Sequence, residues 1–331
     1  MQPYDRISRY KSALMGIMIL IVVYGHLLYY HSGLQNYQDL NITEWYTVGS
    51  VDIFLFLSGF GIYHSLRKNA DPLRFMERRL GRLLPSYLPF ILVYCAFMMA
   101  TGQMNKWQAL GNLTTFGWWA QIGGQFNWYI PIQIAAYLAS PLLFALIEKH
   151  GKRALLLFPV LFLLDAACVG TSLMMGVSRL PVYFLGMYMG REAALGHQPS
   201  RRHMLISAVL FVISMVGFYF LVTRWPDGLR TYGFWWHPFL LSTPFCLYMT
   251  TWILEKLESA APGRLLRRGL EFLGGKSFEI YLLHLLVYTV GLTFGVRGWK
   301  KWILLAVAGI VTGVAYSYAV DWMTGLRKKA S

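Results

Sequence analysis

Apolar residues fill long, uninterrupted stretches of this chain, and short polar segments separate these stretches. Ten apolar stretches occur, at residues 12–30, 46–66, 83–101, 127–147, 154–173, 180–190, 204–223, 231–254, 277–296 and 302–320. A helix needs about 20 mainly apolar residues to cross the hydrocarbon core of a bilayer, and most of these stretches have that length. The pattern predicts an all-α polytopic membrane protein with about ten transmembrane helices.

The segments between the stretches are short and contain no internal repeat and no Pro/Gly-rich linker. We therefore expect residues 1–331 to form a single integral-membrane domain without an appended soluble domain. Glycines spaced four residues apart allow two helices to approach closely in lipid. Three such pairs occur, namely Gly186/Gly190, Gly291/Gly295 and Gly309/Gly313.

The composition agrees with a membrane location. Hydrophobic residues make up 56% of the chain and charged residues 14%, compared with roughly 45–50% and about 25% in an average soluble domain. Thirty Lys and Arg residues against fifteen Asp and Glu residues give a formal net charge of +15, which in a soluble protein would favour a nucleic-acid partner. Here 23 of the 30 basic residues lie in segments that would share one side of a ten-helix bundle. The charge is then mainly an orientation signal, and no nucleic-acid partner is expected.

The positive-inside rule assigns the basic side to the cytoplasm, so both termini are predicted to be cytoplasmic. We expect a multi-pass protein of the inner or plasma membrane. Cys95, Cys168 and Cys246 lie far apart in apolar stretches without a CxxC spacing, so the sequence indicates neither a disulfide framework nor a zinc site. No metal and no bound cofactor are expected.

A few ionisable residues lie within the apolar stretches, where a charge is costly and usually serves a function. They are His26, Asp52, His64, Asp165, His237, Glu279 and His284. His26 lies four residues, about 6 Å, before the outer end of the first stretch, and Asp52 lies six residues, about 9 Å, inside the second. At this similar depth the Asp52 carboxylate would hold the His26 imidazole in one tautomer, as a general base requires. The two side chains would equally serve as a polar packing contact between helices, and the sequence leaves both interpretations open.

Three arginines, Arg78, Arg79 and Arg82, precede the third stretch on the predicted cytoplasmic side. On a helix, the i,i+4 spacing places Arg78 and Arg82 on one face, and the i,i+3 spacing brings Arg79 near Arg82. Forked guanidinium groups are suited to phosphate. The alternative interpretation is an anchor at the lipid headgroups.

Several recognisable segments follow one another over nearly the whole chain. They are ILIVVYGH ending at His26, VDIFLFLSGFGIY with Asp52, FMERRLGRLLPSY with the three arginines, Trp128-Tyr129 followed by Tyr137 and Pro141, RLPVYFLGMYMG from Arg179 to Gly190, and LGGKSFEIYLLH from Leu273 to His284. Each segment alone is a weak signal, whereas their order and spacing are specific. Together they resemble the membrane acyltransferase-3 family, which comprises O-acyltransferases, usually O-acetyltransferases, of surface glycans.

The resemblance implies transfer of an acyl group, usually acetyl, from cytoplasmic acyl-CoA to a hydroxyl of an exported or cell-surface glycan or a lipid-linked sugar. His26 corresponds to the essential first-helix histidine of the family, acting as a base or as an acyl carrier, with Asp52 as its expected partner. The three arginines match the family's cytoplasmic arginine motif, and we expect them to bind the donor. His284 is expected to be a second polar contact to the donor or a buried histidine satisfied within the protein. Trp128 is expected to contact the acceptor on the outer side, and Arg179 is expected either to contact an anionic acceptor there or to cap the sixth helix.

The chain departs from the family pattern at two positions. Met15 stands where family members usually carry arginine, and Gln133 stands where many carry glutamate. The missing arginine supports an alternative interpretation, a non-catalytic membrane sensor on the same scaffold. A multi-pass transporter or flippase, in which the buried polar residues line a pathway, is a further alternative.

Overall fold

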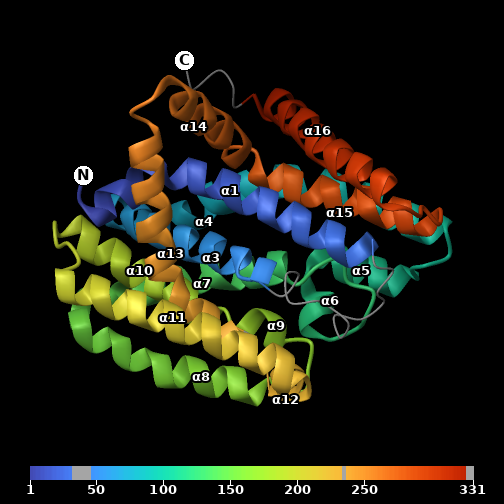
Figure 1. The fold of residues 1–331 in the computed structure, drawn as a ribbon. Helices are drawn as coiled ribbons and strands as arrows, with labels where there is room; N and C mark the ends of the chain where they lie inside the picture. The colour runs from blue at the N-terminus through green and yellow to red at the C-terminus, as the bar shows by residue number, and fades with distance from the viewer. Residues whose placement is uncertain (32–45, 233–235, 326–331) are drawn as a thin grey trace. The chain divides into compact units, whose positions relative to one another are not determined.

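The structure, a computed structural model, describes residues 1–31, 46–232 and 236–325, which form helices and turns without any β-strand. The principal helices are α1 (Pro3–His31), α3 (Ser50–Lys68), α4 (Pro72–Ala100), α7 (Tyr129–His150), α8 (Phe158–Ala167), α10 (Leu180–Ala194), α11 (Arg201–Arg224), α13 (Trp236–Leu257), α15 (Ser277–Thr293) and α16 (Trp299–Thr324). Shorter elements connect them (Figure 1), namely α5 (Lys106–Thr114), α6 (Phe116–Trp119), the 3-10 helix η2 (Gly151–Leu157), α9 (Met174–Val177), α12 (Pro226–Tyr232) and α14 (Ala261–Gly274).

Each of the ten apolar stretches overlaps one of the principal helices among the described residues, which confirms the all-α prediction. Among the described residues, five helical segments are long and apolar enough to cross a membrane, namely Pro3–His31, Pro72–Ala100, Tyr129–Ala167, Arg201–Arg224 and Trp299–Thr324. The chain thus has the character of a multi-pass membrane protein, whereas the ten spans and the cytoplasmic termini stay predictions. Residues 233–235 of the eighth stretch and the basic residues 327–329 lie outside the described residues.

The long segment from Tyr129 to Ala167 contains two helices because Gly151 interrupts it. Gly151 ends α7 with φ at +54°, a left-handed conformation that favours glycine. The chain continues through η2, and α8 then begins with Pro159 in its first turn, where the missing N–H has no intrahelical acceptor to lose. The two predicted stretches 127–147 and 154–173 therefore correspond to α7 and α8.

Two neighbouring residues, Asp71 and Pro72, determine where α4 begins. The Asp71 side chain caps this helix by accepting hydrogen bonds from the backbone N–H groups of Leu73 at 2.9 Å and Arg74 at 3.3 Å, and Pro72 occupies the first turn. The helix then runs without interruption to Ala100. The three arginines predicted to bind the donor consequently lie on one continuous helix.

The described helices group into two compact units that alternate along the sequence. Unit 1 comprises Met1–Ile7, Asp52–Gly81 and Cys95–Met249, and unit 2 comprises Ser8–Val51, Arg82–Tyr94 and Thr250–Ser331. The helices α1, α4 and α13 contribute residues to both units. No single cut in the chain separates the two units, because each contains three separate segments.

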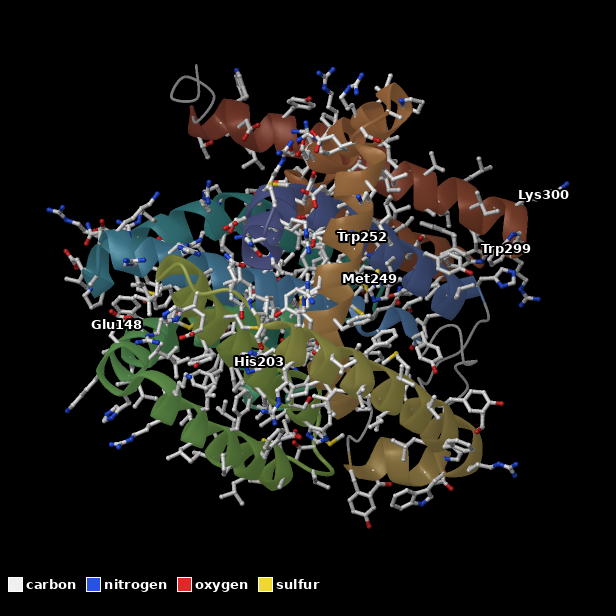
Figure 2. All side chains as sticks on the ribbon, turned by 60° about the vertical axis from the view of Figure 1, so that its left-hand side comes forward. Glu148, His203, Met249, Trp252, Trp299 and Lys300 are labelled. Atoms are coloured by element: carbon white, nitrogen blue, oxygen red, sulfur yellow. The ribbon has the colours of Figure 1, made fainter. Side chains whose placement is uncertain are left out.

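Large apolar side chains are exposed on several helix faces. Met249 and Trp252, which are 40% and 44% exposed, lie three residues apart on α13 (Figure 2). At the first turn of α16, Trp299 lies next to Lys300 (Figure 2), a combination typical of the membrane–water interface. The exposed apolar side chains of α11 include Leu205, Val209, Val212, Ile213, Val216 and Phe220. Surfaces of this kind indicate contact with lipid.

In unit 2, α15 and α16 pack side by side (Figure 1), and two glycines make this close approach possible. A Cβ atom added at Gly309 would lie 2.7 Å from Cα of His284, and one added at Gly313 would lie 2.5 Å from Cα of Ile280. Carbon atoms do not approach this closely without displacement of the backbone. The sequence-based prediction of helix packing is therefore confirmed for Gly309 and Gly313.

The other two glycine pairs differ from each other. In unit 1, Gly186 and Gly190 of α10 lie against the backbone of Phe56 and Phe60 in α3, which confirms their predicted packing role. Gly295 instead adopts a φ of +64° just beyond the end of α15, and a Cβ atom there would meet open space. Its predicted packing role is wrong, because this glycine serves the turn after the helix.

The Gly309→Ala variant tests the close packing of α15 against α16. We expect it to lose about 1–3 kcal/mol of unfolding free energy because the added methyl group forces the His284 backbone away. The matched control is Gly217→Ala in α11, where a Cβ atom meets nothing within 4 Å and the higher helix propensity of alanine is expected to stabilise slightly. Reversible unfolding in detergent measures both variants, and equal stability of the two would contradict the packing argument.

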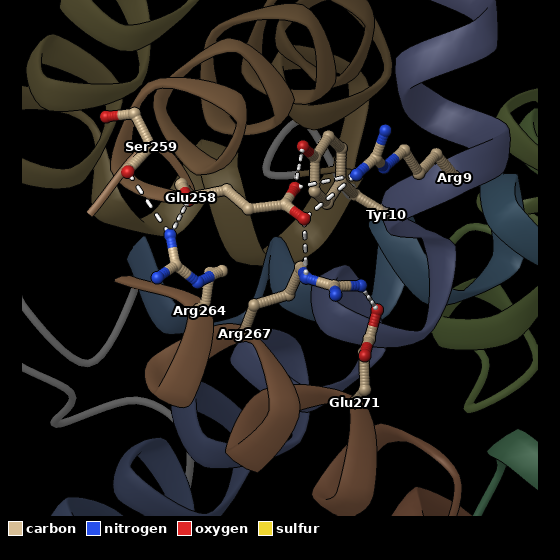
Figure 3. A network of polar contacts seen from close by, with 7 residues as sticks. All are labelled: Arg9, Tyr10, Glu258, Ser259, Arg264, Arg267 and Glu271. Carbon is tan, nitrogen blue, oxygen red and sulfur yellow. Dashed lines mark hydrogen bonds and ion pairs between the residues drawn. The ribbon is translucent and has the colours of Figure 1, made fainter. Parts of the chain in front are cut away.

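A cluster of charged side chains joins the beginning of α1 to the α13–α14 connection in unit 2 (Figure 3). Arg9 donates to both carboxylate oxygens of Glu258, at 2.9 and 3.0 Å, and the Tyr10 hydroxyl donates at 2.6 Å. Arg267 of α14 lies 3.3 Å from the same carboxylate and also pairs with Glu271 at 2.7 Å. Glu258 thus links three segments of unit 2.

The contacts of Glu258 predict that stability depends on pH. The hydrogen bond from Tyr10 lowers the pKa of Glu258, and Arg267 and Arg9 lower it further. Because its pKa is lowered in the folded protein, the ionised Glu258 side chain stabilises the fold. This stabilisation is complete above the ordinary titration range of glutamate, near pH 4 to 5, and is lost as the pH falls through the lowered pKa. We expect the thermal unfolding midpoint in detergent to fall more steeply below pH 4 in the wild type than in Glu258→Gln. Parallel pH profiles for the two proteins would contradict this role.

Candidate functional site

The first candidate cluster lies in unit 2 and consists of two histidines. Nδ1 of His26 in α1 lies 3.0 Å from Nε2 of His284 in α15, and the ring centroids are 5.1 Å apart. Nδ1 of His284 lies 2.8 Å from the carbonyl oxygen of Ile280, one helical turn earlier. The His284 side chain is completely buried, whereas His26 is partly exposed. His26 is therefore the member of the pair that can meet a substrate.

Aromatic side chains surround the histidine pair. The ring of Tyr30 lies 6.4 Å from that of His26, and the rings of Tyr281 and Tyr288 lie 5.8 and 5.6 Å from that of His284. The Tyr288 hydroxyl donates a hydrogen bond of 3.1 Å to the carbonyl oxygen of Val23 and so ties α15 to α1 three residues before His26. An apolar, aromatic surrounding of this kind strengthens the hydrogen bonds within it.

Sequence reasoning named both histidines and did not pair them. His284 was interpreted as a second polar contact to the donor or as a buried histidine satisfied within the protein. The structure brings the two residues together within unit 2.

The second cluster lies in unit 1 and contains Asp52, Arg179 and Trp128. The guanidinium group of Arg179 forms an ion pair with the carboxylate of Asp52, and both residues are only 1% exposed. Nε of Arg179 donates to the carbonyl oxygen of Met175 at 3.3 Å. The guanidinium carbon lies 4.8 Å from the centroid of the Trp128 ring, in a cation–π contact. Three residues from different parts of the sequence thus form one buried arrangement.

This arrangement bears on three sequence-based predictions. Trp128 and Arg179, both named as candidate contacts of the acceptor, lie in contact with each other. Asp52 has Arg179 as a charged partner within its own unit, a pairing that the sequence analysis did not consider. The expected dyad of His26 with Asp52 joins residues of different units and stays a prediction.

A further polar pair in unit 1 consists of the buried Asp165 in α8 and the partly exposed His237 in α13. Nε2 of His237 lies 3.0 Å from Oδ2 of Asp165. Both residues line a cavity of about 420 Å³ together with apolar side chains, among them Phe162, Leu240 and Leu241. The sequence identified both members as ionisable residues within apolar stretches. Their contact with each other lowers the cost of placing polar side chains in such stretches.

The three arginines of α4 do not all point the same way. Arg78 and Arg82 are exposed and share one face of the helix, as their spacing predicts. Arg79 is partly buried, and its guanidinium carbon lies 5.4 Å from the centroid of the Phe75 ring. The side chains of Arg78 and Arg82 therefore lie at the protein surface, whereas Arg79 is partly covered.

These observations describe buried polar pairs, exposed arginines and a partly exposed histidine within apolar helices. The family model of an acyltransferase domain, that of the acyltransferase-3 family, matches residues 13–322. The chain belongs to this family. No curated protein and no solved structure matches the sequence. The family match covers every residue named above in the two clusters and on α4.

Membership of the acyltransferase-3 family makes the chain a membrane acyltransferase. The family resemblance found in the sequence segments is thereby confirmed over nearly the whole chain. Gln133, one of the two departures from the family pattern, is buried in unit 1 and donates a hydrogen bond of 3.2 Å to the hydroxyl of Ser58.

A double-mutant cycle tests the pairing of Asp52 with Arg179. Each single variant, Asp52→Asn or Arg179→Met, leaves one buried partner without its countercharge, and we expect each to lose about 3–5 kcal/mol of unfolding free energy. The double variant is expected to lose clearly less than the sum, because it leaves no charge buried alone. Unfolding in detergent gives all three values. Strict additivity would mean that the two side chains do not stabilise each other.

Proposed function

We propose that this acyltransferase transfers an acetyl group from cytoplasmic acetyl-CoA to a hydroxyl of an exported or cell-surface glycan, with His26 as the general base. The observation that carries the proposal is the partly exposed His26 imidazole, whose Nδ1 contacts Nε2 of the buried His284 ring, in a chain of the acyltransferase-3 family. An imidazole is the commonest general base in proteins, and a positioned ring is what this role requires.

In the proposed reaction, a ring nitrogen of His26 removes the proton from the acceptor hydroxyl. The hydroxyl oxygen forms a bond to the carbonyl carbon of the thioester, and the bond between that carbon and the CoA sulfur breaks. The departing thiolate then takes the proton from His26, so that the imidazole is neutral again. A route through an acyl group on His26 would use the same ring and the same leaving thiolate.

The donor side of the proposal rests on α4. The exposed guanidinium groups of Arg78 and Arg82 form a site suited to the phosphates of CoA. Arg79 is positioned differently, because it packs on Phe75. The rise from residue 12 to His26 along α1 is about 21 Å, a distance that the extended pantetheine arm of CoA would bridge from the cytoplasmic side.

The acceptor side of the proposal rests on Trp128. Its ring is partly exposed, and such a ring can stack on a sugar, while the guanidinium group of Arg179 supports it within the unit. Arg179 is almost completely buried and paired with Asp52, which supports a role in holding Trp128 rather than in direct contact with the acceptor.

The proposed topology has ten spans, with both termini in the cytoplasm of a cell whose inner or plasma membrane contains the protein. The distribution of 23 of the 30 basic residues on one side supports this orientation. It places the α4 arginines on the side of acetyl-CoA. It also places the outer end of α1, next to His26, on the side of the exported acceptor.

Inverted membrane vesicles with the full chain test the proposed reaction. Acetyl-CoA with a radiolabelled acetyl group is added outside, where the cytoplasmic face of the membrane is exposed. We expect label to accumulate as hydroxylamine-labile ester in the glycan fraction, with release of an equal amount of CoA. His26→Ala should reduce both by at least about 100-fold, as expected for loss of a general base. Equal labelling by wild type and His26→Ala would overturn the assignment.

One variant serves as a matched control, and a second tests the donor site. His203→Ala changes an exposed histidine at the beginning of α11 (Figure 2), and its activity should equal that of the wild type. Arg78→Gln combined with Arg82→Gln should raise the KM for acetyl-CoA and leave the amount of protein in the membrane unchanged. Movement of an unacetylated sugar without CoA release would support the flippase alternative, and neither activity would support the sensor.

A further inference from the structure

The hydrogen bonds around the histidine pair determine which ring nitrogens carry protons when both rings are neutral. Nδ1 of His284 lies 2.8 Å from the carbonyl oxygen of Ile280, which can only accept, so this nitrogen must carry the proton. Nε2 of His284 then holds a lone pair. It lies 3.0 Å from Nδ1 of His26, which must therefore be the donor. The lone pair of His26 is consequently on Nε2.

We propose that His284 is a positioning residue for acyl transfer, which holds His26 in the tautomer whose Nε2 accepts the proton of the acceptor hydroxyl and which shares that proton during the reaction. The inference rests on the proposed function, in which His26 is the base. It assigns the reacting atom, Nε2, and gives His284 a role that differs from direct binding of the donor.

The pair also provides a place for the proton while the reaction proceeds. When Nε2 of His26 gains the hydroxyl proton, the proton on Nδ1 can move along the 3.0 Å hydrogen bond to Nε2 of His284. His284 then carries the positive charge, with its Nδ1–H still bonded to Ile280. Return of that proton to Nδ1 of His26, and transfer of the Nε2 proton to the CoA thiolate, restore both neutral rings. Sharing the charge between two rings lowers the cost of a buried cation.

The surroundings of His284 support a fixed position. Its side chain is 0% exposed, and Gly309 of α16 packs directly on its backbone. The Tyr288 hydroxyl holds α15 against α1 through the carbonyl oxygen of Val23 at 3.1 Å. Both ring nitrogens of His284 are engaged in hydrogen bonds, with His26 and with Ile280. A ring held in this way is suited to orienting its neighbour and has no nitrogen left for a donor molecule.

Two variants of His284 separate positioning from the other roles in the vesicle assay. In His284→Gln, the side-chain oxygen can still accept from Nδ1 of His26, and we expect kcat to fall by no more than about tenfold. In His284→Leu, the side chain at position 284 can no longer accept, which leaves only the backbone hydrogen bond of His26 to Val22, and kcat should fall by about 100-fold or more. The KM for acetyl-CoA should change little in both. A rise in that KM with unchanged kcat would indicate donor binding, and equal losses of kcat in both variants would overturn the positioning role.

The tautomer can be measured without any turnover, which keeps the inference distinguishable from the proposed function. Full-length protein with ¹⁵N-labelled histidine is reconstituted in lipid, and one-bond ¹H–¹⁵N correlation spectra are compared with those of His26→Ala to assign the His26 signals. At neutral pH we expect the proton of His26 on Nδ1 in the wild type and in His284→Gln. In His284→Leu the fraction of His26 with its proton on Nδ1 should fall, because only the backbone hydrogen bond to Val22 remains. A proton on Nε2 of His26 in the wild type would overturn the inference, whether or not the protein transfers acetyl groups.

Discussion

A polar group inside a lipid bilayer must find its partner within the protein, because no water is available to replace it. The described helices satisfy this constraint with pairs of side chains that are distant in sequence. His26 lies against His284, Asp52 against Arg179, and Asp165 against His237. Two of the pairs join two helices and the pair of Asp52 with Arg179 joins α3 to the turn before α10, each within one compact unit, so these polar residues also help to specify how the helices pack.

Close helix packing is what makes the histidine pair possible. α15 can approach α16 only because Gly309 and Gly313 lack side chains at the contact, and this contact supports the turn that carries His284. Tyr288 holds the same helix to α1. Backbone geometry, aromatic packing and the hydrogen bond to Ile280 therefore act together on one imidazole ring.

Much of the fold follows from the sequence pattern, because stretches of apolar residues form helices in lipid whatever their neighbours are. The start of α4 was not predicted: the helix begins at Pro72, eleven residues before its apolar stretch, because Asp71 caps it in a polar segment that hydrophobicity does not mark. The spacing of Gly186 and Gly190 indicated their packing correctly, whereas the same spacing misled at Gly295, which serves a turn. Spacing along one chain segment does not reveal whether a partner helix is present.

The candidate site was predictable in its members but not in its pairings. Apolar context singled out His26, Asp52 and His284, since ionisable side chains are rare there. Depth counted along ideal helices suggested Asp52 as the partner of His26. Such counting ignores how far each helix extends beyond its apolar stretch and how it is tilted. α1, for example, begins at Pro3, nine residues before its apolar stretch.

The central claim of this account is that Nε2 of His26 takes the proton from the acceptor hydroxyl during acyl transfer. An experimental structure of the full chain in lipid with a non-hydrolysable acetyl-CoA analogue, in which a methylene group replaces the thioester sulfur, tests this claim most directly. We expect the acyl carbon within about 6 Å of Nε2, which leaves room for one hydroxyl between base and carbonyl carbon. An acyl carbon more than about 10 Å from His26 in the bound state, too far for that single hydroxyl to bridge, would contradict the account.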